Sequence, residues 1–147
     1  MQIPPDMLRC VAFACYQTRV KASQGAEGTI FFLSVEEDGR TFWYAVTAAH
    51  VIETIHKRPG GDGKVYLRLN LSSDRGTEMF STEYADWIRH SDPGNDVAVY
   101  RWSVSDEFDH SPWPITAQLI DDVAEGFHIG PGDNVFFLGS ILRAKRT

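Results

Sequence analysis

The chain has 147 residues, of which 43% are hydrophobic and 23% are charged. This length and composition suit one globular domain, or one domain followed by the beginning of a second, and they argue against a disordered chain. The net charge of -6 disfavours nucleic-acid and membrane partners, because those surfaces need clustered basic residues. No apolar run reaches the roughly 18 residues of a membrane span, and residues 1–5 resemble no secretory signal. We therefore expect a cytoplasmic protein.

The two cysteines, Cys10 and Cys15, lie in a stretch that is predicted to form the first strand. Their odd spacing sends the two side chains to opposite faces of a strand, so a disulfide between them is not expected. Two free thiols are typical of a reducing compartment, and they exclude a scaffold held together by disulfides.

Short strands separated by turn residues follow. Residues 29–35 and 41–47 are rich in Ile, Phe, Val and Tyr, and the pair Asp38-Gly39 between them favours a tight hairpin turn. Residues 65–71 alternate between apolar and polar side chains, which is typical of a half-buried antiparallel strand. The apolar face of that strand contains Val65, Leu67, Leu69 and Leu71.

The second half of the chain continues the pattern. Residues 83–89 and 96–102 are strand candidates on either side of a cluster of turn formers. Residues 103–114 are polar and contain two prolines, which indicates a connecting segment. Two more strand candidates cover residues 115–120 and 134–138. Many short strands with turns between them predict an all-β antiparallel barrel or sandwich.

One short helix is predicted from about His50 to Lys57, with three inward-facing residues, before a Pro-Gly-Gly stop at residues 59–61. The inward-facing residues are Val51, Ile52 and Ile55.

Two residues are candidates for acid–base chemistry. His50 follows an apolar strand and two small residues, so its ring has room to face a neighbouring group, as a general base requires. Asp96 opens a strand, where a carboxylate can accept a hydrogen bond from one imidazole nitrogen and stabilise the imidazolium. Asp92 is a rival for that role, but Pro93 follows it and favours a turn. The alternative interpretations are that His50 is an ordinary histidine at the start of a helix and that Asp96 is a turn residue.

The segments around these residues resemble the histidine and aspartate motifs of trypsin-like, chymotrypsin-fold serine peptidases. They read Val-Thr-Ala-Ala-His, ending at His50, and Asp-Val-Ala-Val, beginning at Asp96. Residues 28–32 resemble the glycine-led strand that opens the histidine hairpin of that family, and residues 131–139 resemble the first strand of its second barrel. All four segments occur in family order. The similarity is greatest to bacterial members without disulfides, because Val51 stands where others have cysteine.

The resemblance implies a fold and a reaction. It implies an antiparallel Greek-key barrel of the six-stranded type over residues 8–105, a connection over 106–130, and the beginning of an incomplete second barrel over 131–147. It also implies peptide-bond hydrolysis with His50 as general base and Asp96 as its orienter, without a cofactor or metal. The partners expected from it are a protein or peptide substrate, and a second copy bound through the exposed inter-barrel face.

The third motif of the family, a serine within Gly-x-Ser-Gly, is absent from the sequence. Gly139-Ser140 lacks the following glycine, and both cysteines precede the histidine, where a family nucleophile does not lie. Loss of the serine costs about 10⁶ in turnover in such enzymes. We therefore expect an N-terminal portion of a serine endopeptidase that is inactive alone. The alternative is a non-catalytic barrel that binds a peptide or a partner protein.

A metal-dependent or nucleotide-dependent enzyme has less support. The remaining histidines show no metal-ligand spacing, and we expect them to be surface or packing residues. They are His56, His90, His110 and His128. Residues 60–64 lack the leading glycine and the final Ser or Thr of a phosphate-binding loop, and they precede a strand instead of following one.

Overall fold

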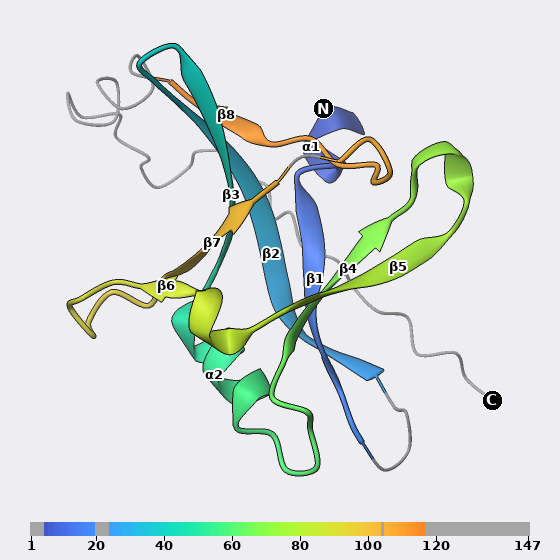
Figure 1. Ribbon diagram of the computed structural model, residues 1–147, viewed down its shortest axis with the longest axis vertical. Coiled ribbons are helices and arrows are strands. Elements are labelled where there is room, and N and C mark those ends of the chain that lie inside the picture. The colour runs from blue at the N-terminus through green and yellow to red at the C-terminus, as the bar shows by residue number, and fades with distance from the viewer. Residues whose placement is uncertain (1–4, 20–23, 104, 117–147) are drawn as a thin grey trace, which may run out of the picture.

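The computed structural model describes residues 5–19, 24–103 and 105–116. The architecture is a curled, mostly antiparallel β-sheet with a two-turn helix at one end (Figure 1), which confirms the predicted all-β class. Among the described residues, no helix is both long and apolar enough to cross a membrane. The strand predicted at 134–138 and the second-barrel segment at 131–147 lie outside the described residues.

The strands form one sheet in the order β5-β4-β1-β2-β3-β7-β6, and β8 adds to the edge of β2. Every pairing is antiparallel except that of β8 with β2, which is parallel. In chain order the elements are α1 (Pro5–Leu8), β1 (Val11–Gln17), β2 (Gln24–Glu37), β3 (Arg40–Thr47), α2 (Ala49–His56), β4 (Val65–Asn70), the 3-10 helix η1 (Ser72–Asp74), β5 (Thr77–Thr82), the 3-10 helix η2 (Tyr84–Asp86), β6 (Ile88–Arg89), β7 (Ala98–Trp102) and β8 (Trp113–Ile115).

The predicted hairpin and helix are both present. Strands β2 and β3 are paired up to Glu37 and Arg40, which flank a two-residue turn. The turn residues Asp38 and Gly39 have φ angles of 50° and 70°, the left-handed conformation that a tight hairpin turn needs and that Asp and Gly tolerate. Helix α2 lies within one residue of the predicted bounds.

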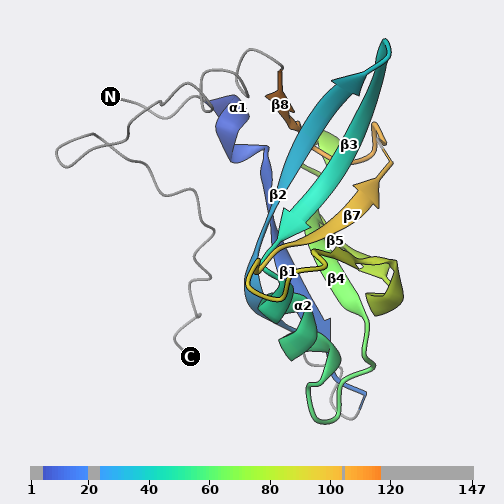
Figure 2. The ribbon, with the colours of Figure 1, turned by 90° about the vertical axis from the view of Figure 1, so that its left-hand side faces the viewer.

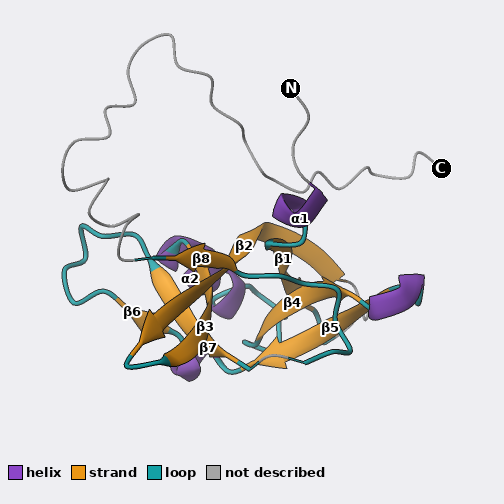
Figure 3. Ribbon diagram, turned by 90° about the horizontal axis from the view of Figure 1, so that it is seen from above, coloured by secondary structure: helices purple, strands orange, loops and turns teal. Residues whose placement is uncertain are grey.

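The sheet curls so that its two ends approach each other (Figure 3). The ring of Phe80 on β5 lies 5.0 Å, between centroids, from the ring of Trp102 on β7, and residues 83–87 connect β5 directly to β6. Among the described strands, hydrogen bonding leaves the sheet open between β5 and β6. The enclosed core contains Ala12, Ala14, Ile30, Phe32, Ala45, Val51, Ile52, Ile55, Val65, Leu67, Leu69, Trp87, Ala98, Trp102 and Phe108.

The strand predicted over residues 83–89 is wrong in most of its length. Residues Tyr84–Asp86 form the turn η2, and only Ile88–Arg89 pair as a strand. The indole N–H of Trp87 donates a 2.8 Å hydrogen bond to Oγ1 of Thr82, which holds the bend closed and buries the ring. Strand β4 pairs with β5, a mostly exposed strand that the sequence did not predict.

Residues 105–116, which we call the strap, run back across the sheet after β7. Main-chain hydrogen bonds from Ser72 to Glu107, from Asp109 to Asn70 and from Ser111 to Arg9 hold it, at 2.8, 2.9 and 3.0 Å. Its end forms β8 in a region predicted to be a connection, and Pro114 is tolerated there because β8 is an edge strand.

Both cysteines are buried thiols that form no disulfide. Strand β1 begins after Cys10, and its register shifts between Ala14 and Cys15, so simple alternation does not place the two thiols. Burial raises the pKa of Cys15 to about 11, although Arg68 lowers it in part. A thiol with this pKa stays protonated at neutral pH and is a poor nucleophile.

Candidate functional site

The sheet register brings the two candidate residues together at one end of the molecule. Thr47, the last residue of β3, pairs with Ala98, the first residue of β7. His50 lies three positions after Thr47, at the start of α2, and Asp96 lies two positions before Ala98. Helix α2 therefore occupies the end of the sheet where β7 begins (Figures 1 and 2).

Asp96 contacts His50 through both of its carboxylate oxygens. Oδ2 lies 2.5 Å from the ring nitrogen Nδ1, and Oδ1 accepts a 2.9 Å hydrogen bond from the main-chain N–H of His50. A carboxylate at Nδ1 requires a proton on that nitrogen, which leaves the lone pair of a neutral ring on Nε2. Two contacts to one residue fix both the tautomer and the orientation of the ring.

The site is open to solvent. The His50 side chain is 69% exposed and that of Asp96 is 52% exposed. In an active site that is closed to solvent, the carboxylate that orients the histidine is buried more deeply. The main-chain and side-chain hydrogen bonds from His50 hold the pKa of the Asp96 carboxyl below its usual range, and a main-chain bond from Ala49 contributes. Asp96 is therefore ionised at neutral pH.

The turn before β7 positions Asp96 and excludes its rival. Asp92 accepts hydrogen bonds at Oδ1 from the Gly94 N–H, at 2.9 Å, and at Oδ2 from the Asn95 side chain, at 3.3 Å. The main-chain N–H of Asn95 also donates to the Asp92 carbonyl, at 3.0 Å. Asp92 is thus a turn residue, and the structure places Asp96, not Asp92, against His50.

Helix α2 holds His50 by burying the opposite side of its first turns. Val51, Ile52 and Ile55 all enter the core. A Cβ atom on Gly28 would come within 2.8 and 2.9 Å of the two γ-methyl carbons of Val51, so the strand β2 must have glycine where the helix crosses it. The hydroxyl of Thr47 donates a 2.8 Å hydrogen bond to the Thr29 carbonyl and ties the end of β3 to β2.

Gly28→Ala is expected to lower the free energy of unfolding by about 1–3 kcal/mol, because the new methyl group must displace Val51. In a Val51→Ala background the same change is expected to cost much less, because the clashing methyl groups are gone. Chemical denaturation of the four chains in this double-mutant cycle measures the coupling. If Gly28→Ala lowered the free energy of unfolding equally in both backgrounds, the contact between Gly28 and Val51 would be contradicted.

In His50→Ala, the Asp96 carboxyl pKa is expected to rise toward its ordinary value. The ring contact is lost, whereas the main-chain N–H at position 50 remains, so the return is partial. A carboxyl-carbon NMR titration of both chains measures it. A titration of Asp96 that is the same in both chains would contradict the ring contact.

A second cluster, which the sequence did not predict, lies beside the pair His50 and Asp96, which we call the dyad. Glu53, one turn after His50, lies 3.7 Å from the guanidinium of Arg89. That guanidinium lies 4.8 Å from the ring centroid of Tyr84 and bonds its hydroxyl, and Tyr84 stacks on His56 with ring centroids 4.0 Å apart. This cluster fastens the turn η2 to helix α2. No local signal predicts it, since its members come from distant parts of the sequence.

The other described histidines contact main-chain groups or lie in the core. Nδ1 of His56 lies 3.0 Å from the Gly63 carbonyl, His90 accepts a hydrogen bond in the turn before Asp96, and His110 is buried. Within the described ranges, no group of three or more His, Cys, Asp or Glu residues could hold a metal ion. His128 and Gly139-Ser140 lie outside the described residues.

His50 and Asp96 thus have the geometry of a base and its orienter. The Gly-x-Ser-Gly motif that would supply the nucleophile is absent from the sequence. Comparisons of this chain with protein-family models, with curated proteins and with solved structures found no match.

Proposed function

We propose that this chain carries the N-terminal β-barrel of a trypsin-like serine endopeptidase, in which His50 is the general base and Asp96 orients it. The observation that carries the proposal is the double contact of one carboxylate with Nδ1 and the main-chain N–H of the same histidine. A carboxylate at a helix N-terminus makes the main-chain contact for stability alone, so the ring contact is the part specific to acid–base chemistry. The contact with Nδ1 selects the tautomer that a base acting through Nε2 needs.

The strand order supports the barrel part of the proposal. The ends of the sheet, β5 and β6, follow each other in the chain, and Phe80 of β5 packs against Trp102 of β7. In this arrangement β5 and β6 are two halves of one interrupted strand, the first paired with β4 and the second with β7. The proposed barrel has six strands when β5 and β6 are counted as one and β8 is left outside. The second barrel would begin at residues 131–147.

The proposed reaction assigns one proton transfer to each step. Nε2 of His50 removes the proton from a serine hydroxyl as its oxygen attacks the peptide carbonyl, and the imidazolium then donates this proton to the leaving amine. Asp96 remains ionised and stabilises the imidazolium. The serine must come from a polypeptide segment outside these 147 residues, because no Gly-x-Ser-Gly occurs among them.

Expression of the reading frame together with the coding sequence that follows codon 147 tests the proposal. A fluorophosphonate probe is expected to label that product, and His50→Ala is expected to abolish labelling because the serine is no longer activated. His56→Ala, on the same helix but outside the dyad, is the matched control and should be labelled normally. Labelling of the His50→Ala variant would contradict the proposal. A reading frame that encodes no Gly-x-Ser-Gly over a further domain length of about 100–150 residues would also contradict it.

A second candidate is a non-catalytic barrel that binds a peptide or a partner protein, including a second copy of itself. The exposed dyad and the missing serine motif favour it over other classes of function. Light scattering on the purified chain, followed by titration with unstructured peptides, distinguishes the two candidates. Saturable peptide binding that is unaffected by His50→Ala would favour the binding module.

A further inference from the structure

The outer face of the sheet carries a continuous row of apolar side chains, which we call the apolar stripe: Val11, Phe31, Val46, Val99 and Ile88. The register pairs each member with the next across the strands β1, β2, β3, β7 and β6. Neighbouring strands lie about 4.8 Å apart, so four steps make a stripe roughly 19 Å long.

These residues lie on the face of the sheet opposite the core cluster. The stripe is open at Phe31 and Ile88, whereas Val46 is buried, with 7% exposure. Ile30, Phe32 and Ala45, which alternate with members of the stripe, are completely buried inside, and alternation sends Phe31 and Val46 to the opposite face. Phe31 is 42% exposed and Ile88 is 68% exposed. Side chains on the outside of a solvated barrel are normally polar, so an apolar row across five strands indicates a covered surface.

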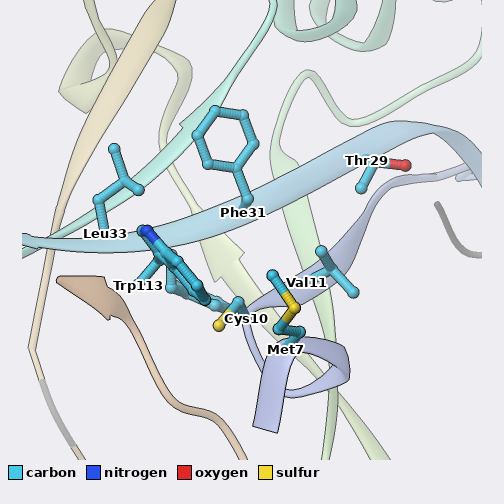
Figure 4. Close-up of a pocket in the computed structure, with 8 residues that line it drawn as sticks. Met7, Cys10, Val11, Thr29, Phe31, Leu33 and Trp113 are labelled. Carbon is cyan, nitrogen blue, oxygen red and sulfur yellow. The ribbon is translucent and has the colours of Figure 1, made fainter. Parts of the chain in front are cut away.

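A pocket continues the stripe beyond Val11 (Figure 4). It has a volume of about 280 Å³ and lies between helix α1, the beginning of β1, the middle of β2 and the strand β8. Met7, Leu33 and Trp113 line it together with Phe31 of the stripe. Trp113 is itself 42% exposed, so this end of the surface also lacks a cover among the described residues.

We propose that residues 134–142 of the same chain cover the apolar stripe and its pocket. This segment, Asn-Val-Phe-Phe-Leu-Gly-Ser-Ile-Leu, contains six apolar side chains and no charged residue. It therefore matches the stripe in chemistry, and it would itself expose a large apolar surface if it stayed in water. Covering one with the other removes both surfaces from solvent.

The length of the chain permits this contact. The last described residue, Thr116, follows β8, whose Trp113 lines the pocket. The linking residues 117–133 can span about 55 Å when extended, and nine residues cover about 30 Å. Both lengths exceed the roughly 19 Å of the stripe. A tethered segment has an effective concentration of about 1 mM, which favours it over a second copy at micromolar concentration. The proposal does not depend on a catalytic role for His50.

A double-mutant cycle in the full chain tests the contact. Phe31→Ala is expected to lower the folding equilibrium constant on the order of tenfold in the natural background, and less than about twofold when Phe136 and Phe137 are both alanine. Ile88→Ala should likewise lower the folding equilibrium constant in the natural background and change it little when Phe136 and Phe137 are both alanine. Because Ile88 is 68% exposed, this variant is expected to fold. Phe42→Ala is the matched control, because Phe42 is a half-buried aromatic residue on the same outer face of β3 but outside the stripe.

Sedimentation velocity on the same chains distinguishes the occupants of the surface. The proposal is supported if the chain is a monomer and the double-mutant cycle shows energetic coupling of Phe31 and Ile88 with Phe136 and Phe137, but no such coupling of Phe42. Additive effects at both Phe31 and Ile88 would overturn it. A dimer that Ile88→Ala dissociates would also overturn it, because the occupant would then be a second copy.

Discussion

Replacing His110 with alanine is expected to lower the free energy of unfolding by about 3 kcal/mol at pH 7. His110 is buried, and its Nε2 accepts a 2.7 Å hydrogen bond from the indole N–H of Trp102, while Nδ1 lies 3.1 Å from the Phe108 carbonyl. Alanine would leave a cavity between the strap and the sheet and a buried indole donor without an acceptor. Chemical denaturation measures the loss.

The same residue is expected to make the fold sensitive to acid. Burial lowers the pKa of His110, with a smaller contribution from Arg9, against the raising effects of the Phe108 carbonyl and Asp109. The unfolded chain therefore binds a proton near pH 6.5 that the folded chain does not bind, so the contribution of His110 to stability is constant above that pH and falls below it. One such group contributes a slope of up to about 1.4 kcal/mol per pH unit.

Denaturation curves between pH 7.5 and pH 5 check this pH dependence. The stability of the natural chain is expected to fall more steeply with acid than that of His110→Ala. Parallel curves for the natural chain and His110→Ala would show that His110 titrates equally in the folded and unfolded states.

Asp96→Asn is expected to slow fluorophosphonate labelling by about 10⁴-fold in a form of the protein that contains the proposed serine. An asparagine that donates its amide hydrogen to Nδ1 selects the tautomer with the proton on Nε2, so the nitrogen that should accept the serine proton is already occupied. Single-turnover labelling rates measure the effect, and circular dichroism checks that the sheet is intact.

Asp92→Asn is the matched control for that change. Asp92 lies in the same turn but bonds only within the turn, so its replacement should leave the labelling rate within a few-fold of the natural chain. Equal slowing by both changes would indicate that the turn as a whole is disturbed, and the specific role of Asp96 would then be rejected.

Features with a local cause could be predicted from the sequence. The Asp38-Gly39 turn needs only the tolerance of these two residues for positive φ, and the strand β4 follows from strict alternation of apolar and polar side chains. Helix α2 follows from three apolar residues at helical spacing. The motifs around His50 and Asp96 predict these two candidate residues, and the strand that follows Asp96 favours it over Asp92.

Features with a distant cause could not be predicted. Residues 83–89 contain Tyr, Trp and Ile, which favour strands, but the hydrogen bond between Trp87 and Thr82 bends them into a turn. Strand β8 forms because the strap returns to the free edge of β2 beyond the beginning of β1. The bond between Trp102 and His110 likewise depends on this return.

The sequence by itself determined the all-β class, the hairpin, the helix and the identity of two residues suited to acid–base chemistry, because each depends on neighbours within a few positions. Only the tertiary structure decided that these two residues meet, since 46 positions separate them and the pairing of β3 with β7 sets their distance. The same cross-strand register aligns the five residues of the apolar stripe. Distances across a sheet depend on register, and register is a property of the folded core as a whole.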